Sequence, residues 1–540
     1  MYRKANNANS EVYMHVQIIA LILLPLTFVG SGLFQDPSMP AASGGVRLLR
    51  QDAIAARQAG QTISPEEIRR YVNALADDSM RGRMTPSPEL EEAAHYVAAE
   101  FQRAKLRPRG DDHGYFQRYE INEVQVLPES TAVWTTGMEP MKWTYGVDYV
   151  PHPFNDFSDW TIQGRAMLLV GPVGGRVDFD TASLRGRVLF IPLTAKGLGQ
   201  NYGRIVGWHP AAVLRVQDVP DSIFSQLMSE AARTHVRAPG STVARLPMLV
   251  MRDRAAAPLM LRGGSDLAEI RRTQTDTILQ TIPLGDAVVH VRLRVRSVLH
   301  QNPANVVAVL PGTDPVLRSE YVVYSAHIDH LGIGIPVSGD SIYNGADDNA
   351  SGTAAVLAVA KAFAYLAHPP RRSVMFVLFS GEEGLGLGSE FFLNQPPVPN
   401  SALVADLNAD MVGRNWRDTL IVIGQRDSDL GQVVDRVLAS FPDLGLAVTD
   451  SSTRPNDVPT ANLYWWSDHG AFIRRGIPFL YFYSGMHPDY HRPSDSADKI
   501  DAEKLARISR LMFYVGLEVA NKNTRPQWDP DRQGRLVSPR

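Results

Sequence analysis

The pattern of apolar and polar residues differs between regions of the chain. Between residues 300 and 522, continuous apolar runs such as 321–327 (YVVYSAH) and 374–379 (VMFVLF) alternate with segments of helical spacing such as 351–367. Such runs are typical of strands buried on both faces, and their alternation with helices indicates an α/β fold. We therefore predict a mixed, largely parallel sheet that is flanked by helices.

Two amphipathic helices are predicted upstream of this region. Residues 63–75 (ISPEEIRRYVNAL) begin with Ser64, a proline and two acids, which is the pattern of a helix N-terminus. Residues 88–106 (PELEEAAHYVAAEFQRAKL) repeat apolar residues at helical spacing.

The texture changes from about 155 to 290, where short apolar runs such as RAMLLVG and GRVLFIP are separated by turns. This pattern predicts a mainly β insert. Its histidines His209 and His235 stand alone in the sequence, so we expect them at the surface or in turns.

The N-terminus carries one strongly apolar stretch, residues 16–34, which is preceded by Arg3 and Lys4. Its dense part is short for a membrane span and suits the core of a secretory signal, so we expect export to the periplasm or the outside of the cell. An uncleaved segment would instead anchor the protein to the membrane. The predicted organisation is a signal peptide or anchor (1–34), a linker (35–61), the N-terminal part of the main domain (62–150), the insert (155–290), the main domain (300–522) and a C-terminal tail (523–540).

Composition removes some classes of function. The 54 Lys and Arg residues nearly balance the 57 Asp and Glu residues, for a net charge of -3, which gives no electrostatic reason to expect a nucleic acid partner. The chain has no cysteine, so a metal ion would have to be held by His, Asp or Glu.

Candidate metal ligands follow the ends of the predicted strands. The adjacent acids Glu382 and Glu383 come directly after the run VMFVLF, where two neighbouring carboxylates need a compensating cation. In open α/β sheets, ligands collect at the carboxyl ends of the strands. The candidates at this edge are His327, Asp329 and His330 after one strand, Asp347 and Asp348 before the long helix, the pair Glu382 and Glu383, Asp410, and His487, Tyr490 and His491 after the last strand.

Two imidazoles and three carboxylates suit a pair of divalent ions such as zinc, with one carboxylate shared between them. Two ions about 3.5–4 Å apart lower the pKa of a water molecule and stabilise both oxygens of a carbonyl addition intermediate. The double acid then has an explanation, because one glutamate binds a metal and its neighbour takes the proton from the water.

The motifs HIDH, GADDNASG, GEEGLG, NADMVG and DYHRPSD together resemble the M28 family of co-catalytic zinc peptidases, in particular its bacterial aminopeptidases. The resemblance covers residues 300–520, and residues 77–112 are similar to the usual N-terminal portion of the family. The insert resembles a protease-associated (PA) domain through LRGRVLFI and HPAAVLRV, which implies that it covers the active site and restricts access to it.

The resemblance implies a role for each candidate. His327 and Asp410 would bind one zinc ion, Glu383 and His491 the other, and Asp348 would bridge the two. Glu382 would be the general base. Asp329 would orient the imidazole of His327, and the hydroxyl of Tyr490 would stabilise the oxyanion. His330 and His487 would support the site rather than bind metal, and the peptide bond from Asp348 to Asn349 would be cis.

One motif departs from the family. In WWSDHGAF, this chain has Trp466 where some members have an arginine, so Trp465 or Trp466 is expected to line a hydrophobic specificity pocket instead.

The sequence thus predicts an exported aminopeptidase with two zinc ions and peptides as its substrates. Alternatives on the same scaffold are a carboxypeptidase or a glutaminyl cyclase, but cyclases of this fold use a single metal and all five ligands are retained here. A catalytically inactive binding ectodomain is a further alternative, for which lost ligands would be the signature. The sequence does not fix the oligomeric state.

Overall fold

A computed structural model describes residues 50–137, 140–152, 155, 157–173, 176–192, 202–237, 246–273, 278–384, 386–451 and 460–536. The apolar stretch 16–34, with the predicted signal peptide or anchor, lies outside the described residues. Within the described ranges, every helix is too short or too polar to cross a membrane.

The first helices cover the main sheet. They are α1 (Arg50–Gln61), α2 (Pro65–Leu75) and α3 (Pro88–Arg103). The hydroxyls of Ser64 and Ser87 accept the backbone N–H groups of Glu67 and Leu90 at 3.3 and 3.0 Å, which caps α2 and α3 as predicted. Helix α1 lies inside the segment 35–61 predicted as a linker, so that prediction is wrong for residues 50–61, whose alanines, arginines and glutamines favour a helix.

The main sheet has nine strands. Their order is β1-β15-β19-β16-β20-β23-β21-β22, with β2 also paired to β15. Strands β19, β16, β20 and β23 are parallel. Strands β15 and β21 pair with them antiparallel on either side, and β22 is parallel to β21, so the sheet is mixed, as the sequence predicts. The strands are β1 (Arg107–Pro108), β2 (Phe116–Arg118), β15 (Ala304–Leu310), β16 (Tyr321–His327), β19 (Ser373–Phe379), β20 (Leu403–Ala409), β21 (Thr419–Ile423), β22 (Ala447–Thr449) and β23 (Phe479–Tyr483).

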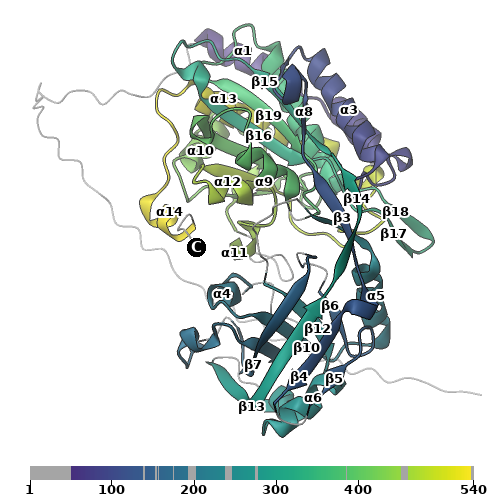
Figure 1. Ribbon diagram of the computed structural model, residues 1–540. Coiled ribbons are helices and arrows are strands. Elements are labelled where there is room, and N and C mark those ends of the chain that lie inside the picture. The colour runs from purple at the N-terminus through teal and green to yellow at the C-terminus, as the bar shows by residue number, and fades with distance from the viewer. Residues whose placement is uncertain are drawn as a thin grey trace, which may run out of the picture. The chain divides into compact units, whose positions relative to one another are not determined.

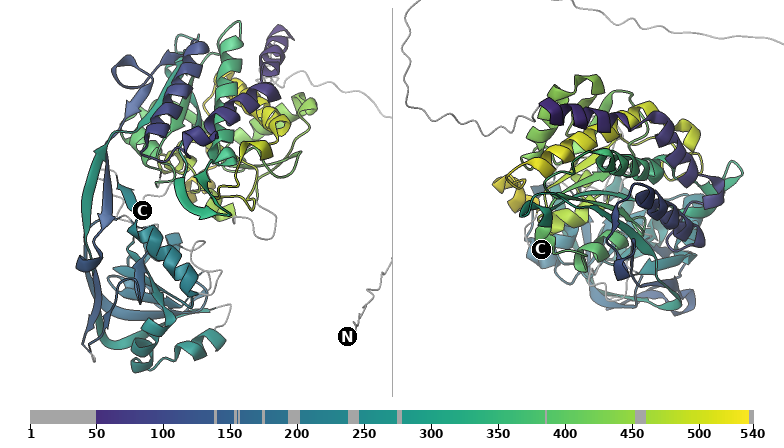
Figure 2. Two further views of the ribbon diagram at one scale, coloured as in Figure 1. Left: turned by 90° about the vertical axis from the view of Figure 1, so that its right-hand side faces the viewer. Right: turned by 90° about the horizontal axis from the view of Figure 1, so that it is seen from above.

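Helices cover both faces of this sheet (Figure 1). On one face, side chains of α1 to α3, α8 (Gly352–Tyr365), α10 (Leu430–Ser440) and α13 (Ala502–Asn521) share a core with alternate strand residues. Figure 2 shows the purple N-terminal helices beside the yellow α13. On the other face, α9 (Leu387–Asn394) and α12 (His469–Arg474) pack against the remaining strand residues. The central strands, whose residues are apolar on both faces, are therefore covered by helices on both faces.

A second nine-stranded sheet belongs to the insert, in the order β5-β4-β13-β7-β9-β10-β12-β6, with β8 paired to β13. Its strands are β4 (Ala132–Thr136), β5 (Lys142–Trp143), β6 (Tyr149–Pro151), β7 (Trp160–Val170), β8 (Arg176–Val177), β9 (Val188–Pro192), β10 (Ala212–Gln217), β12 (Met248–Arg252) and β13 (Ile278–Leu293). Its helices are α4 (Tyr202–Gly207), α5 (Asp221–Ala232), α6 (Asp253–Arg262) and α7 (Leu267–Thr273).

The predicted bounds of the insert, 155–290, are therefore too narrow. Strands β4 to β6 lie within residues 62–150, which the sequence assigns to the main domain, and they are two to five residues long, too short to show a clear period. The insert also contains more helix than predicted. A third sheet joins β3 (Ile121–Val126) to β11 (Thr234–Arg237) and β14 (Val295–Gln301).

The two isolated histidines differ. His209 is exposed in a turn with a φ of 52°, as predicted. His235 lies in strand β11 and stacks on Phe157 with ring centroids 3.4 Å apart, so the surface or turn prediction is wrong for it. A single histidine in sequence gives no sign of an aromatic partner far along the chain.

The remaining elements lie near the C-terminus and around the candidate site. They are α11 (Thr460–Leu463), α14 (Pro530–Leu536) and the hairpin of β17 (Gly332–Val337) and β18 (Asp340–Tyr343). The predicted tail, 523–540, is partly packed, because the indole N–H of Trp528 donates to the carbonyl of Gly476 at 2.8 Å.

Candidate active site

The parallel strands bring the predicted ligands to one edge of the main sheet. Strand β16 ends at His327, and Glu382 and Glu383 follow the end of β19. Asp410 follows β20, and the loop after β23 leads to His491. Because these four strands run in the same direction side by side, their carboxyl ends meet.

A first cluster forms around His327. Its Nε2 atom lies 3.4 Å from Oδ1 of Asp348, 3.5 Å from Oδ2 of Asp410 and 4.0 Å from Oε2 of Glu382. The imidazole and both aspartates are almost fully buried. One imidazole and two carboxylates thus converge on a common point.

A second cluster forms on the other side of Asp348. Nε2 of His491 lies 3.2 Å from Oδ2 of Asp348 and 3.3 Å from Oε2 of Glu383. The two carboxylate oxygens of Asp348 therefore face different imidazoles. All five candidate ligands lie together, and the peptide bond from Asp348 to Asn349 is cis, as the resemblance implies.

His330 lies closer to the second cluster than the sequence suggests. Its Nδ1 atom is 2.7 Å from Oε1 of Glu383 and 3.8 Å from Oδ2 of Asp348. Its ring is fully buried, whereas the side chain of His491 is 35% exposed. The contact with Glu383 makes His330 a further nitrogen donor beside this carboxylate.

The donor set fits divalent metal ions. Ligand atoms of His327, Asp348 and Asp410 lie within 4.8 Å of one another, and so do those of His330, Asp348 and Glu383. Buried Nε2 atoms of His327 and His330 and Oδ1 of Asp410 have no hydrogen-bond partner among the described residues. Buried polar atoms of this kind need a partner, and imidazole with carboxylate is a donor set that zinc prefers.

The pKa values reflect this concentration of opposite charges. Burial lowers the pKa of His327, but the carboxylates of Asp410 and Glu382 raise it well above its usual value. Burial also lowers the pKa of His491, and Glu383 with Asp348 raises it well above normal. Conversely, burial raises the pKa of Asp348, but three neighbouring imidazoles bring it well below its usual value. Burial likewise raises the pKa of Glu383, which His491 chiefly brings down to about 2.

Glu382 behaves differently from its neighbour. Burial raises its pKa well above the usual value, and the nearby carboxylates of Glu383, Asp468 and Asp410 add to this rise, although His327 opposes it. It belongs to neither set of ligand atoms that lie within 4.8 Å of one another, and its side chain is 17% exposed. A partly exposed carboxylate with a raised pKa is suited to accept a proton.

Asp329 supports both His327 and Glu382. Nδ1 of His327 donates to the backbone carbonyl of Asp329 at 3.1 Å, while the Asp329 carboxylate is 3.7 Å away. The imidazole is thus held mainly by the carbonyl rather than by the carboxylate that the sequence favours. Oδ1 of Asp329 instead accepts the backbone N–H of Glu382 at 3.2 Å.

Tyr490 and Trp466 form an aromatic wall beside His491. The ring of Tyr490 stacks on the imidazole of His491 with centroids 3.9 Å apart, and Trp466 lies 6.4 Å from Tyr490. Trp465 is 37% exposed, and the guanidinium of Arg474 lies 5.8 Å from its ring. Of the two tryptophans, Trp466 is therefore the one beside the predicted catalytic tyrosine.

Two acids at the site have no role in the sequence prediction. Oδ2 of Asp495 accepts the backbone N–H groups of Asp347 and Asp348 at 2.9 and 3.1 Å, which holds the bridging loop, and His487 lies 3.3 Å from Asp347. Burial raises the pKa of Asp468 to about 7. Asp495 stands in the motif RPSD and Asp468 in SDHG. Their position inside these motifs was the signal in the sequence that could have placed them at the site.

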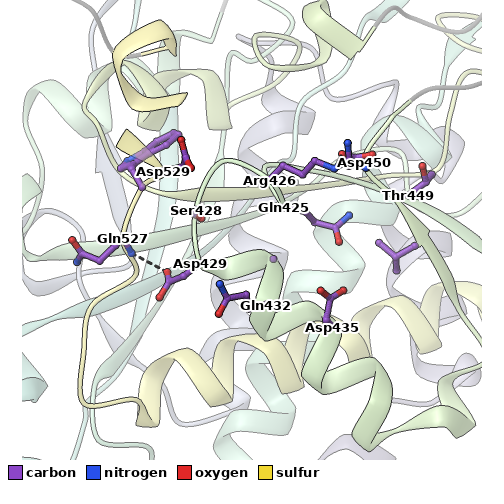
Figure 3. A pocket seen from close by; sticks show the side chains of 13 residues that line it. Gln425, Arg426, Ser428, Asp429, Gln432, Asp435, Thr449, Asp450, Gln527 and Asp529 are labelled. Carbon is purple, nitrogen blue, oxygen red and sulfur yellow. Dashed lines mark hydrogen bonds and ion pairs between the residues drawn. The ribbon is translucent and has the colours of Figure 1, made fainter. Parts of the chain in front are cut away.

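A pocket of about 790 Å³ lies elsewhere, between the C-terminal segment and the N-terminal part of α10. Figure 3 shows Gln527 beside Asp429 and Arg426 beside Asp450. These acids are already compensated, because Lys522 lies 2.7 Å from Asp429 and Arg426 lies 2.5 Å from Asp450. The pocket shares no residue with the metal-binding candidates, so it is not the predicted site.

Comparison with known proteins finds similarity over the main domain. Residues 305–516 match the model of peptidase family M28. A probable leucine aminopeptidase of Arthroderma otae is 26% identical over 224 residues, which are 40% of this chain and 57% of that protein. Aminopeptidase YwaD of Bacillus subtilis is 24% identical over 248 residues, or 44% of this chain and 49% of that one. The chain thus matches only about half of the length of these relatives.

The structure of the aminopeptidase from Aneurinibacillus sp. strain AM-1 resembles most of this structure. The similarity covers 88% of this chain and 98% of that chain, with a TM-score of 0.52 and 17% sequence identity. At this identity the similarity shows the fold, which includes the mixed sheet flanked by helices.

Proposed function

Because residues 305–516 match the model of peptidase family M28, we propose that this protein is an exported aminopeptidase that hydrolyses the first peptide bond of its substrates with two zinc ions. One observation carries the proposal. The carboxylate of Asp348 lies between His327 and His491, with Oδ1 3.4 Å from one imidazole and Oδ2 3.2 Å from the other. This is the arrangement that a bridging carboxylate requires.

In this proposal His327, Asp348 and Asp410 hold one ion, and Asp348, Glu383 and His491 hold the other. His330 donates a hydrogen bond to Glu383, which keeps that carboxylate turned toward His491. When bound, the ions supply Lewis acidity, which lowers the pKa of a water molecule and polarises the scissile carbonyl.

The side chains of the chain then carry the proton and orient the reactants. Glu382 accepts the proton of the attacking water and returns it to the amine nitrogen that leaves. Burial and the nearby carboxylates raise its pKa well above the usual value, which strengthens it as a proton acceptor. Tyr490 donates its hydroxyl proton in a hydrogen bond to the oxyanion. Burial raises the pKa of Tyr490 well above its usual value, with further contributions from the nearby carboxylates, so the hydroxyl remains a donor.

Substrate selection follows from charge and shape at the same site. The part-buried carboxylates of Glu382 and Glu383 and the buried carboxylate of Asp410 favour a positively charged group, and the free α-amine of a peptide supplies one. The aromatic wall of Tyr490 and Trp466 offers an apolar surface to the first side chain of the peptide.

Export and a gating insert complete the proposal. Residues 16–34 would direct the chain out of the cytoplasm, and the PA-like insert would limit access to the site. Cell fractionation with detection of the full chain tests export, and a chain retained in the cytoplasm would contradict it.

The decisive experiment compares peptides with free and with N-acetylated N-termini. We expect hydrolysis of the free peptides only, loss of that hydrolysis with a metal chelator, and its return when zinc is added. Equal cleavage of the acetylated peptides would rule out an aminopeptidase while leaving a hydrolase. Cleavage that is unaffected by thorough metal removal would rule out the zinc mechanism.

A further inference from the structure

Residues 81–86 (RGRMTP) lie outside the part of the chain that matches the M28 model, yet they reach the candidate site. This segment connects the short turn after α2 to α3. Arg83 and Thr85 are its buried polar members, with exposed fractions of 1% and 6%. Both side chains make hydrogen bonds that end beside the proposed metal ligands or the proposed base.

Thr85 connects the loop of Asp329 to the loop of Glu382. Its hydroxyl donates to Oδ2 of Asp329 at 2.9 Å and accepts the backbone N–H of Gly381 at 2.9 Å. Oδ1 of the same Asp329 accepts the N–H of Glu382 at 3.2 Å. Only a hydroxyl can donate and accept through one atom in this way. The two consecutive N–H groups before and at the base are therefore fixed to one Thr–Asp pair.

Arg83 connects the loop of His327 to the loop of Asp348. Its guanidinium donates to the carbonyl of Ile328 at 2.7 Å, of Asn344 at 2.8 Å and of Gly345 at 3.1 Å, and it also contacts the carbonyl of Leu75. Ile328 lies between His327 and Asp329, and Gly345 precedes the bridging acid by three residues. A planar fork with five donors can hold several carbonyls at once, which an ammonium group does with less geometric precision.

The backbone of the same segment adds two further links. The carbonyl of Arg83 accepts the N–H of His330 at 3.3 Å, and the carbonyl of Gly82 accepts the N–H of Gly332 at 3.0 Å. The segment is therefore attached to the His327 loop by side chain and main chain alike.

We propose that Arg83 and Thr85 are positioning residues of the active site: Arg83 sets the two ligand loops against each other, and Thr85 sets the base Glu382 relative to His327. The inference rests on the proposed function. A shift of the base relative to the metal ligands impairs the chemical step more than the binding of the peptide, because turnover depends steeply on the geometry of the reacting groups. The consequence is a loss in kcat and in metal affinity with little change in KM.

The test replaces the hydroxyl with a methyl group of the same size, in the full-length protein. Thr85→Val removes both hydrogen bonds, and Thr85→Ser restores them without the methyl group. Thr135→Val is the matched control, because Thr135 is 3% exposed in strand β4 of the insert and its hydroxyl accepts the N–H of Met141 at 2.9 Å. Arg83→Lys keeps the charge and removes the fork.

Three readouts separate positioning from plain stability. They are calorimetric titration of the metal-free protein with zinc, the absorption spectrum of the cobalt-substituted protein, and kcat and KM on a free peptide. For Thr85→Val we expect zinc affinity and kcat each about 10–100-fold lower and an altered cobalt spectrum, as is usual when a residue behind the metal ligands is lost. KM should stay within about twofold of its original value. Thr85→Ser and Thr135→Val should resemble the unaltered protein, and Arg83→Lys should resemble Thr85→Val.

The proposal is overturned if Thr85→Val keeps normal zinc affinity, cobalt spectrum and kcat, or if Thr85→Ser is as impaired as Thr85→Val. If Thr85→Val does not fold, Thr85→Ala takes its place, and failure of both to fold assigns Thr85 to stability alone and overturns the proposal. An unaltered protein that binds no zinc would instead contradict the proposed function, so the two failures are distinguishable.

Discussion

The pKa values of buried histidines shift in opposite directions in the main domain and in the insert. His327 is 1% exposed at the edge of the main sheet, and although burial lowers its pKa, nearby carboxylates raise it well above normal. His152 is 7% exposed beside strand β6 of the insert, and burial together with the charge of Arg215 lowers its pKa to about 3. Neighbouring carboxylates thus raise the pKa of the buried imidazole in the main domain, whereas the buried imidazole in the insert stays neutral.

The difference shows that burial alone does not mark a functional site. Desolvation acts on both histidines, but only the main sheet gathers carboxylates around its imidazoles. Within the described parts of the chain, the groups of histidines and acids close enough to hold an ion both belong to the main domain. Excess buried negative charge, rather than buried polarity, therefore identifies the candidate metal centre.

Removing the shared carboxylate of Asp348 should have the largest effect on metal content and turnover. In Asp348→Ala both imidazoles lose their common partner, so we expect the tightly bound metal and all measurable turnover to disappear. Elemental analysis of the purified protein checks the metal content. Asp253→Ala is the control, because Asp253 is an acid of the insert paired with Arg271 at 2.6 Å, and its loss should leave the metal content unchanged. Full metal content in Asp348→Ala would contradict the bridging role.

Changing the base without changing the ligands should have the next largest effect. Glu382→Gln keeps the shape of the side chain but cannot accept a proton, so we expect kcat to fall about 10²–10⁴-fold. Metal content should stay at the level of the unaltered protein, in contrast to Asp348→Ala. Steady-state kinetics together with elemental analysis checks both expectations. Turnover close to normal would show that another group is the base.

Low pH should lower the free energy of unfolding of the insert, because His152 is neutral in the folded protein. The pKa of His152 is about 3 in the folded protein, against about 6.5 in an unfolded chain. The free energy of unfolding therefore keeps its full value above pH 6.5 as far as His152 is concerned. It falls as the pH falls from 6.5 toward 3, because unfolding takes up a proton at His152. The slope for one such histidine is at most about 1.4 kcal/mol per pH unit.

Urea unfolding of the full chain between pH 7 and pH 5 measures this slope. His152→Gln should flatten it, whereas a slope unchanged by this substitution would mean that His152 does not titrate on unfolding.

An exposed ion pair should have the smallest effect. Arg57 and Asp443 lie 3.0 Å apart, with side chains 44% and 65% exposed. Water and salt screen such pairs, so Asp443→Asn should lower the free energy of unfolding by less than about 1 kcal/mol, and less still at high salt. Thermal unfolding at low and high salt checks this. A larger loss would place Asp443 in a network beyond this pair.

The main sheet, and the convergence of the five ligand candidates at its edge, could be predicted from the sequence for a physical reason. Strands buried on both faces leave continuous apolar runs, and the residues after parallel strands must meet at one edge, so His327, Glu383 and Asp410 could be related without coordinates. Each relation follows from local pattern and from one general rule of sheet geometry.

Contacts that depend on tertiary packing could not be predicted in this way. Thr85 reaches Asp329 across 244 positions of the chain, and no periodicity connects them. His330 was expected to support the site, but the sequence does not show that the loop after β16 places its ring against Glu383. The short strands β4 to β6 belong to the sheet of the insert, which the sequence did not predict, because a strand of two to five residues shows too little periodicity to be assigned.

The most direct test of the metal centre is a crystal structure of the zinc-loaded protein with anomalous scattering at the zinc edge. We expect two peaks, one bound by His327, Asp348 and Asp410 and the other by Asp348, Glu383 and His491. A single peak, or peaks that Asp348 does not bridge, would contradict the account.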